Sequence, residues 1–224
     1  MLDELVALAV PPRCAACRAP GRRAADVLCG DCRRALAWLG AGCCARCALP
    51  LPHGAGCPAR DAPFDCAWSA VAYEGAARDA LHALKFGAAR PLAGVMAAQI
   101  AANAPPRLLS PGAVLVPVPA HPARLRSRGF DPAELLARSL ARRAGLPLQA
   151  ALRRDRARSR QLGASREERL RAGRLGFAPR GPAPPQVVLV DDVHTTGATL
   201  GACAAQLRAA GCKRVVAVTW ARAL

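Results

Sequence analysis

The chain has 224 residues, of which 53% are hydrophobic, so it can build one moderate domain with a small additional one. It contains 32 Lys and Arg against 15 Asp and Glu, a net charge of +17 that suits a polyanionic partner; a solvated basic surface without a dedicated partner is the alternative. The absence of a run of 18 uncharged apolar residues excludes a transmembrane helix, and the acidic start excludes a secretory signal, so we expect a cytoplasmic protein.

Nine of the eleven cysteines lie before residue 67, after a short amphipathic helix expected over residues 1–12. In a compartment that keeps thiols reduced, metal binding is a better interpretation of such a cluster than disulfides. Two C-x2-C pairs come first, and each can present two thiolates to one tetrahedral ion. They predict a structural zinc site formed by Cys14, Cys17, Cys29 and Cys32.

A second, less regular set of cysteines follows between residues 43 and 66. Three of them fit a possible second zinc site: Cys44, Cys47 and Cys57. Cys57 begins a knuckle in which Arg60 stands where a second cysteine is expected. The fourth ligand stays open among Cys43, Cys66 and His53, and a degenerate ribbon held together by packing alone is the alternative.

The remainder of the chain alternates apolar strand patterns with helical ones, which is typical of an α/β fold with a parallel sheet. We expect strands over residues 67–73, 113–118, 187–190 and 214–220. Helices are expected over 76–86, 91–103, from an N-cap at Asp131 to about 144, and over 199–210. Lys85, one of only two lysines, ends the first helix, where it either complements the helix dipole or contacts a phosphate.

Arginines are concentrated between residues 124 and 180, where 16 arginines face five acids. The segment 153–174 cannot bury itself, and so it is a mobile loop, a solvated helix or a contact for a polyanion.

The segment VVLVDDVHTTGATL, residues 187–200, is the most informative stretch of the sequence. A buried strand is followed by Asp191 and Asp192, then by a Thr/Gly loop that leads into a helix. Free N–H groups at a helix N-terminus bind phosphate. Adjacent carboxylates would repel that phosphate but can accept hydrogen bonds from vicinal sugar hydroxyls. The pattern therefore predicts a phosphate beside a diol; a capped helix without a ligand is the alternative.

This segment resembles the signature loop of the type I phosphoribosyltransferases. The order of elements from the cysteine knuckles through Lys85-Phe86, Pro117-Val118-Pro119 and Arg128-Gly129-Phe130 to this loop resembles the ComF family, competence-associated phosphoribosyltransferase-like proteins. The resemblance implies a double zinc ribbon over residues 1–66 and a type I phosphoribosyltransferase-like sheet flanked by helices over 67–224.

The resemblance further implies a site for phosphoribosyl pyrophosphate (PRPP), bound with Mg²⁺. Its residues would be Asp191 and Asp192 at the ribose, Thr195, Thr196, Gly197, Ala198 and Thr199 at the 5′-phosphate, and Pro117, Val118 and Pro119 near the pyrophosphate. Three cations are candidates for catalysis: Lys85, Arg128 and Arg166. Gln161 and Arg166 would belong to a loop that closes over the site.

The expected activity is pentosyl transfer from PRPP, linked to DNA uptake or nucleotide salvage. The alternative is a non-catalytic PRPP or nucleotide sensor, or a competence factor that binds single-stranded DNA and a partner such as a DNA helicase. His194 could serve as a general base, but we expect a neutral side chain facing solvent. Asp131 and Pro132 replace an Asn-Gln pair of the family.

Overall fold

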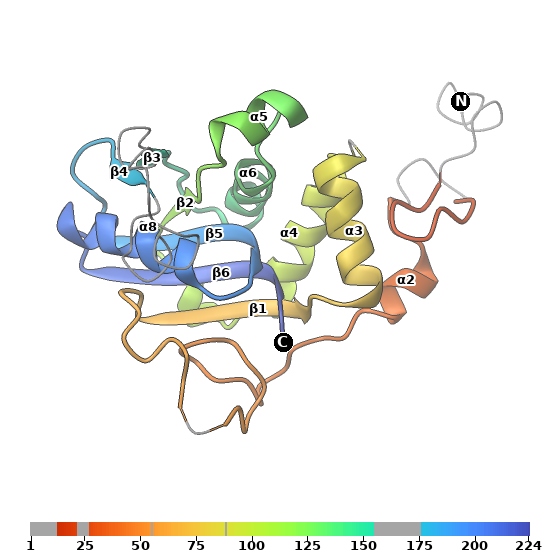
Figure 1. Cartoon of the computed structure of the whole chain (residues 1–224), viewed down its shortest axis with the longest axis horizontal. Coiled ribbons are helices and arrows are strands. Elements are labelled where there is room, and N and C mark those ends of the chain that lie inside the picture. The colour runs from red at the N-terminus through yellow and green to blue at the C-terminus, as the bar shows by residue number, and fades with distance from the viewer. Residues whose placement is uncertain (1–12, 22–26, 55, 88, 155–175) are drawn as a thin grey trace, which may run out of the picture.

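The computed structural model describes residues 13–21, 27–54, 56–87, 89–154 and 176–224. The helix expected over 1–12 and most of the arginine-rich segment, including Gln161 and Arg166, lie outside the described residues. The described chain forms an α/β fold around a four-stranded parallel sheet (Figure 1).

The sheet has the strand order β1 (Cys66–Ala72), β6 (Arg214–Arg222), β5 (Gln186–His194) and β2 (Val114–Pro117). Its central strands are buried on both faces, which explains why residues 187–190 and 215–218 are continuous apolar runs rather than alternating ones. Next to β2, Leu148 forms a parallel bridge with Leu115, so the chain extends the sheet beyond this edge.

Helices cover both faces of the sheet. On one face lie α3 (Gly75–Phe86), α4 (Leu92–Asn103) and α6 (Pro132–Ala144), and on the other lies α8 (Ala198–Ala209) (Figure 1). The α3 helix buries Ala77, Leu81 and Leu84, the helical spacing expected from the sequence. Asp131 caps α6 by accepting hydrogen bonds from the N–H groups of Ala133 and Glu134, as predicted.

The cysteine-rich segment shares both hydrophobic cores with the sheet. Leu28 and Leu36, which flank the short helix α2 (Gly30–Arg34), pack with α3, α4 and α6. Cys47 and Phe64 pack with α8 on the opposite face. The two halves of this segment therefore lie against different faces of one sheet.

Short elements were the ones that sequence patterns did not predict. They are α2 (Gly30–Arg34), α5 (Pro122–Arg128), the 3-10 helix η1 (Pro106–Leu108), and the antiparallel pair β3 (Leu152–Arg154) and β4 (Phe177–Pro179). Elements of three residues show no measurable period, and α5 is an exposed, arginine-rich helix without a buried face. In addition, β5 continues past Val190, so Asp191, Asp192 and His194 belong to the strand.

The connections from β2 and β5 leave in opposite directions. After β5 the chain crosses through α8 to β6 on one side, whereas after β2 it passes through α5 and α6 to Leu148 on the other. A parallel sheet opens a crevice where its connections diverge in this way, outside the carboxyl ends of the strands. That crevice lies beside Pro117 and Asp191.

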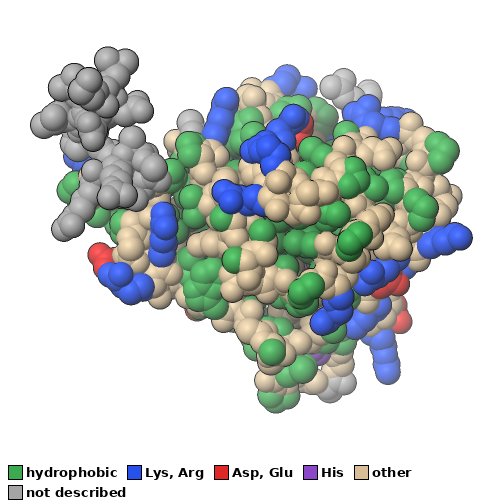
Figure 2. All heavy atoms as spheres, turned by 180° about the vertical axis from the view of Figure 1, so that it is seen from behind, with side chains coloured by type: hydrophobic (Ala, Val, Ile, Leu, Met, Phe, Trp, Pro, Cys, Tyr) green, Lys and Arg blue, Asp and Glu red, His purple; other side chains and the backbone are tan. Residues whose placement is uncertain are grey.

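On the face seen in Figure 2, basic side chains are scattered rather than gathered in one patch, and acidic side chains are few. None of the described helices is long and apolar enough to cross a membrane.

Candidate functional site

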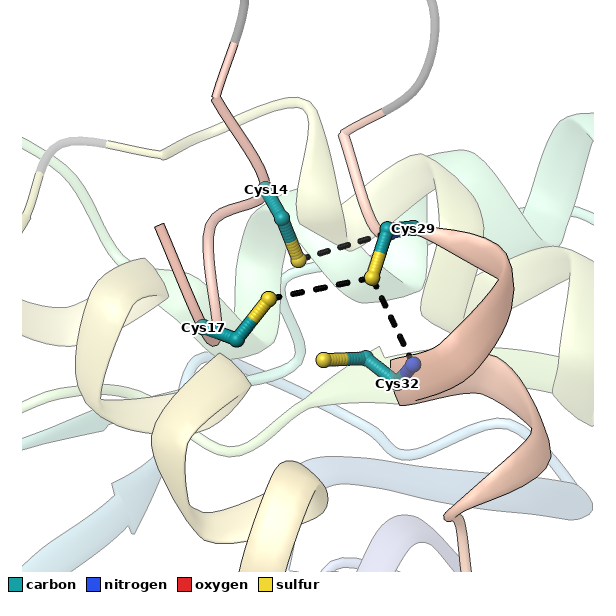
Figure 3. Close-up of side chains that lie close together, drawn as sticks. All are labelled: Cys14, Cys17, Cys29 and Cys32. Atoms are coloured by element: carbon teal, nitrogen blue, oxygen red, sulfur yellow. Dashed lines mark hydrogen bonds between the residues drawn. The ribbon is translucent and has the colours of Figure 1, made fainter. Parts of the chain in front are cut away.

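The first cysteine cluster joins two knuckles that face one another. The sulfur atoms of Cys14, Cys17, Cys29 and Cys32 lie within 4.8 Å of one another and point inward (Figure 3). The Sγ atoms of Cys17 and Cys29 are 3.7 Å apart. A tetrahedral zinc with bonds of about 2.3 Å separates its sulfurs by about 3.8 Å, so this geometry fits the ion.

The protein backbone favours a thiolate at Cys14, whereas burial and the neighbouring thiols raise the pKa of Cys32. Burial raises the pKa of Cys14, but hydrogen bonds from the N–H groups of Cys29, Cys17 and Ala16 outweigh it and bring the pKa to about 6. The thiolate is the form that binds metal. Together with the sulfur spacing, this supports a structural zinc site with all four positions filled by protein.

A second cluster is completed by a histidine. Cys44, Cys47, His53 and Cys57 present ligand atoms within 4.8 Å of one another. The Sγ atoms of Cys44 and Cys57 are 3.8 Å apart, and Cys47 Sγ is 3.5 Å from His53 Nε2. Both separations match tetrahedral zinc, for which a sulfur and a nitrogen ligand lie about 3.6 Å apart. Of the three residues that the sequence left open, the structure brings His53 to the site.

Arg46, which lies between Cys44 and Cys47, holds the turn that follows Cys57. Its guanidinium donates hydrogen bonds of 2.9–3.0 Å to five backbone carbonyls, those of Ala59, Arg60, Ala62, Phe64 and Asp65. Arg60 itself is exposed and contributes its carbonyl rather than its side chain. The residue in place of the expected cysteine therefore has no role as a ligand.

Residues 5–60 match the family model of a double zinc ribbon domain. The match spans both clusters. No curated protein matches the chain. The N-terminal part is therefore similar to a double zinc ribbon, and its two clusters are compatible with two structural zinc ions.

A cavity of about 260 Å³ occupies the crevice at the carboxyl ends of β2 and β5. It brings together residues from four separate stretches of the sequence, at 85, 118–133, 154 and 191–199. Among those that line it are Lys85, Val118, Pro119, Arg128, Asp191, Asp192, Thr195 and Thr199. The structure thus assembles in one cleft most of the residues that the sequence assigned to a phosphate-and-diol site; Arg166 lies outside the described residues.

The two acids of the cleft have different surroundings. Asp192 is buried and pairs with Lys85, whose Nζ lies 2.7 Å from Oδ1. Asp191 accepts the N–H of Asp192 at 2.8 Å. Burial, and secondly the charge of Asp192, raise the pKa of Asp191 to about 8. Lys85 therefore does more than complement a helix dipole, since it neutralises one of two neighbouring carboxylates.

The loop between β5 and α8 depends on Gly197. Gly197 has φ of +79°, and a Cβ at this position would lie 2.9 Å from His194 Nε2. Thr195 and Thr199 face the cleft, whereas Thr196, Gly197 and Ala198 line a second cavity of about 470 Å³ beside residues 57–64. One side of the loop is thus available to a ligand, and the other faces the second zinc ribbon.

His194 is buried, and the prediction that it faces solvent was wrong. Its ring packs edge-on against Phe64, with ring centroids 6.3 Å apart. Burial, and secondly the charge of Arg222, lower its pKa to about 4, so the ring is neutral as expected. A buried ring behind the loop is poorly placed to act on a ligand in the cleft.

Three arginines surround the cleft mouth. The guanidinium of Arg128 lies 4.7 Å from the ring centroid of Phe86, which is 65% exposed. Arg154 stacks on Phe177 at 4.0 Å and donates a hydrogen bond to the carbonyl of Pro119. Arg124 also lines the cleft. Sequence reasoning missed Arg154, which is the last residue of the three-residue strand β3 and belongs to no motif.

Asp131 has a structural task. In addition to capping α6, its Oδ2 accepts the N–H of Ala120 at 2.7 Å. It thereby fixes the turn after β2 that forms one wall of the cleft.

Proposed function

We propose that the cleft binds PRPP and that this chain is a type I phosphoribosyltransferase-like protein of the ComF family. In this assignment residues 1–66 are the double zinc ribbon, and 67–224 are the phosphoribosyltransferase-like part. The observation that supports it best is the placement of two acids and a glycine-dependent helix-entry loop together at the sheet's switch point.

Each part of PRPP would meet a group suited to it. The ribose hydroxyls would donate to Asp191 and Asp192, and the 5′-phosphate would accept from the loop 195–199 at the start of α8. The pyrophosphate would lie beside residues 117–119 near Lys85 and Arg128. Because Lys85 already pairs with Asp192, PRPP would share that carboxylate with the ammonium group.

Catalysis in this proposal is displacement of pyrophosphate from ribose C1 by an acceptor. Lys85 and Arg128 would stabilise the negative charge that develops on the leaving group. The cleft walls would orient the sugar and exclude water. The described carboxylates of the cleft are occupied by Lys85, by backbone N–H groups and by the α6 cap, and they form no oxygen cage for a cation. Mg²⁺ would therefore arrive with PRPP, and it would offset charge on the pyrophosphate.

A PRPP or nucleotide sensor is the second candidate. The burial of His194, whose pKa of about 4 keeps it neutral, favours a sensor, because this candidate general base then lies outside the cleft. In this case the same contacts would bind PRPP without turnover, and the basic surface would hold single-stranded DNA or a competence partner.

Titration of PRPP with Mg²⁺ into the wild type and into the Asp191→Asn/Asp192→Asn variant tests the proposal. We expect binding to the wild type and a loss of affinity of about tenfold or more in the variant. Pyrophosphate release with a candidate base would support transfer, and binding without release would favour the sensor. No binding to a zinc-loaded, folded wild type would refute both.

A further inference from the structure

Arg222, the last residue of β6, connects the second cysteine cluster to the loop after β5. Its side chain is only 4% exposed. Its Nε donates a hydrogen bond of 2.8 Å to the carbonyl of Cys47, a member of the cluster. One of its terminal nitrogens donates to the carbonyls of His194, at 3.0 Å, and of Thr195. A single buried guanidinium thus bridges a metal knuckle and the candidate phosphate loop.

These hydrogen bonds fix the direction in which the loop presents its N–H groups. In a planar trans peptide the C=O and the following N–H point to opposite sides. Because Arg222 binds the carbonyls of His194 and Thr195, the N–H groups of Thr195 and Thr196 are turned away from it. Donors held in this way bind an anion without first reorganising.

No acid among the described residues balances the charge of Arg222. Among the described residues its partners are neutral carbonyls, and it forms no salt bridge. A buried unpaired cation is costly. Zinc bound by three thiolates and a neutral imidazole carries one net negative charge. The occupied second cluster would therefore supply the counter-charge that Arg222 otherwise lacks.

Of two further contacts, one places the second ribbon against the loop and the other places it against α8, which follows the loop. Phe64 packs edge-on against His194, and Gly197 has no side chain, which leaves room for that ring. Arg208 of α8 binds the carboxylate of Asp65 with two hydrogen bonds of 2.6 and 2.7 Å. The loop therefore rests on the ribbon, and a change in the ribbon has a direct route to the loop backbone.

We propose that Arg222 is a positioning residue through which zinc in the Cys44–Cys47–His53–Cys57 site sets the geometry of the phosphate loop. Loss of this zinc weakens phosphate binding although no residue of the cleft has changed. The inference rests on the proposed function only in taking phosphate as the ligand of the loop.

Two variants break the coupling at its two ends. His53→Ala removes one zinc ligand, and Arg222→Met removes the bridge. Both should raise the hydrogen-exchange rate of amides 195–199 by about tenfold or more and weaken PRPP binding similarly. Arg222→Met should still bind two zinc ions, whereas His53→Ala should bind one. His53→Cys, which keeps four ligands, should restore the second zinc, the slow exchange and the affinity.

Arg208→Met is the matched control, because Arg208 lies in the same interface without touching the loop. It should leave exchange in 195–199 and PRPP affinity unchanged. Arg222→Lys keeps the positive charge but not the planar guanidinium, and it provides a second test if Arg222→Met does not fold. It should show an intermediate effect on exchange and affinity.

The exchange measurement separates this inference from the proposed function. A wild type that binds neither PRPP nor inorganic phosphate would refute the proposed function, while exchange in 195–199 would still report the coupling. Wild-type exchange in 195–199 in His53→Ala and in both Arg222 variants would overturn the inference. An equal acceleration in Arg208→Met would also overturn it, because the effect would then be a general loosening of the interface.

Discussion

Lys85 Nζ lies 2.7 Å from Asp192 Oδ1 and joins the last turn of α3 to the carboxyl end of β5. The two side chains are 19% and 8% exposed. Removing one partner leaves the other charge buried without compensation, which is costly. We therefore expect a double-mutant cycle of Lys85→Met and Asp192→Asn to give a coupling energy of about 1–3 kcal/mol in urea unfolding.

Arg138 and Glu134 provide the control for this cycle. They form a salt bridge of 2.8 Å on the exposed face of α6. Their cycle, with Arg138→Met and Glu134→Gln, should give about 0.5 kcal/mol or less. Equal coupling energies in the two cycles would show that the Lys85–Asp192 pair contributes no more to stability than an exposed salt bridge.

The stability of the protein should depend on pH through Asp191. Its pKa is raised from an ordinary 3.8 to about 8, first by burial. The folded state therefore binds a proton that the unfolded state releases, and this contribution to stability is lost as the pH rises from about 4 to 8. Asp191→Asn should consequently gain stability relative to the wild type across this range, by about 1–2 kcal/mol.

Thermal unfolding of both proteins at pH 5 and pH 8 measures this effect. The melting temperature of Asp191→Asn minus that of the wild type should be more positive at pH 8. A difference that is the same at both pH values, or smaller at pH 8, would mean that the pKa of Asp191 is not raised in the folded protein.

The strongly periodic elements were predictable from the sequence, and the pairings between distant residues were not. The strands at 67–73 and 187–190 and the helix capped by Asp131 have a clear apolar period or capping chemistry, and they form within a few residues of the expected bounds. Lys85 and Asp192 are 107 residues apart in the sequence, so only the fold brings them together. Arg222 is the last residue of an apolar strand, and no motif marks it.

The two cysteine clusters differ in how far their ligands could be predicted from the sequence. The first has regular knuckle spacing, and its four ligands could be read from the sequence. In the second, His53 lies on the stretch between Cys47 and Cys57 at a spacing that fits no regular knuckle. The path of the backbone between Cys47 and Cys57 brings His53 to the site, and Arg46 holds only the turn that follows Cys57.

The assignment of His53 predicts the zinc content of two variants. The wild type should bind two zinc ions per chain, and His53→Ala should bind one. Cys43→Ala should still bind two, because Cys43 lies beside the cluster but is not part of it. Zinc measured on the purified proteins decides this. Two ions in His53→Ala together with one in Cys43→Ala would show that the wrong fourth ligand has been assigned.

Gly197 should be intolerant of a side chain. Gly197→Ala puts a Cβ 2.9 Å from His194 Nε2 at a positive φ, which should lower the free energy of unfolding by about 1–2 kcal/mol. Gly201→Ala is the control. Gly201 lies inside α8, where alanine favours the helix, and the added Cβ would lie 3.6 Å from Pro63 Cδ, an ordinary contact. Urea unfolding of both variants gives the comparison, and an equally stable Gly197→Ala protein would contradict the described loop geometry.

The central claim is that one cleft holds a phosphate beside a sugar diol, and it can be tested with ligands that differ in a single hydroxyl. Calorimetric titration of ribose 5-phosphate and 2-deoxyribose 5-phosphate into the zinc-loaded protein compares them. We predict that the wild type binds the ribose compound about tenfold or more tightly and that Asp191→Asn/Asp192→Asn loses this preference. Equal affinities for the two sugars in the wild type would contradict the assignment of Asp191 and Asp192 to the diol.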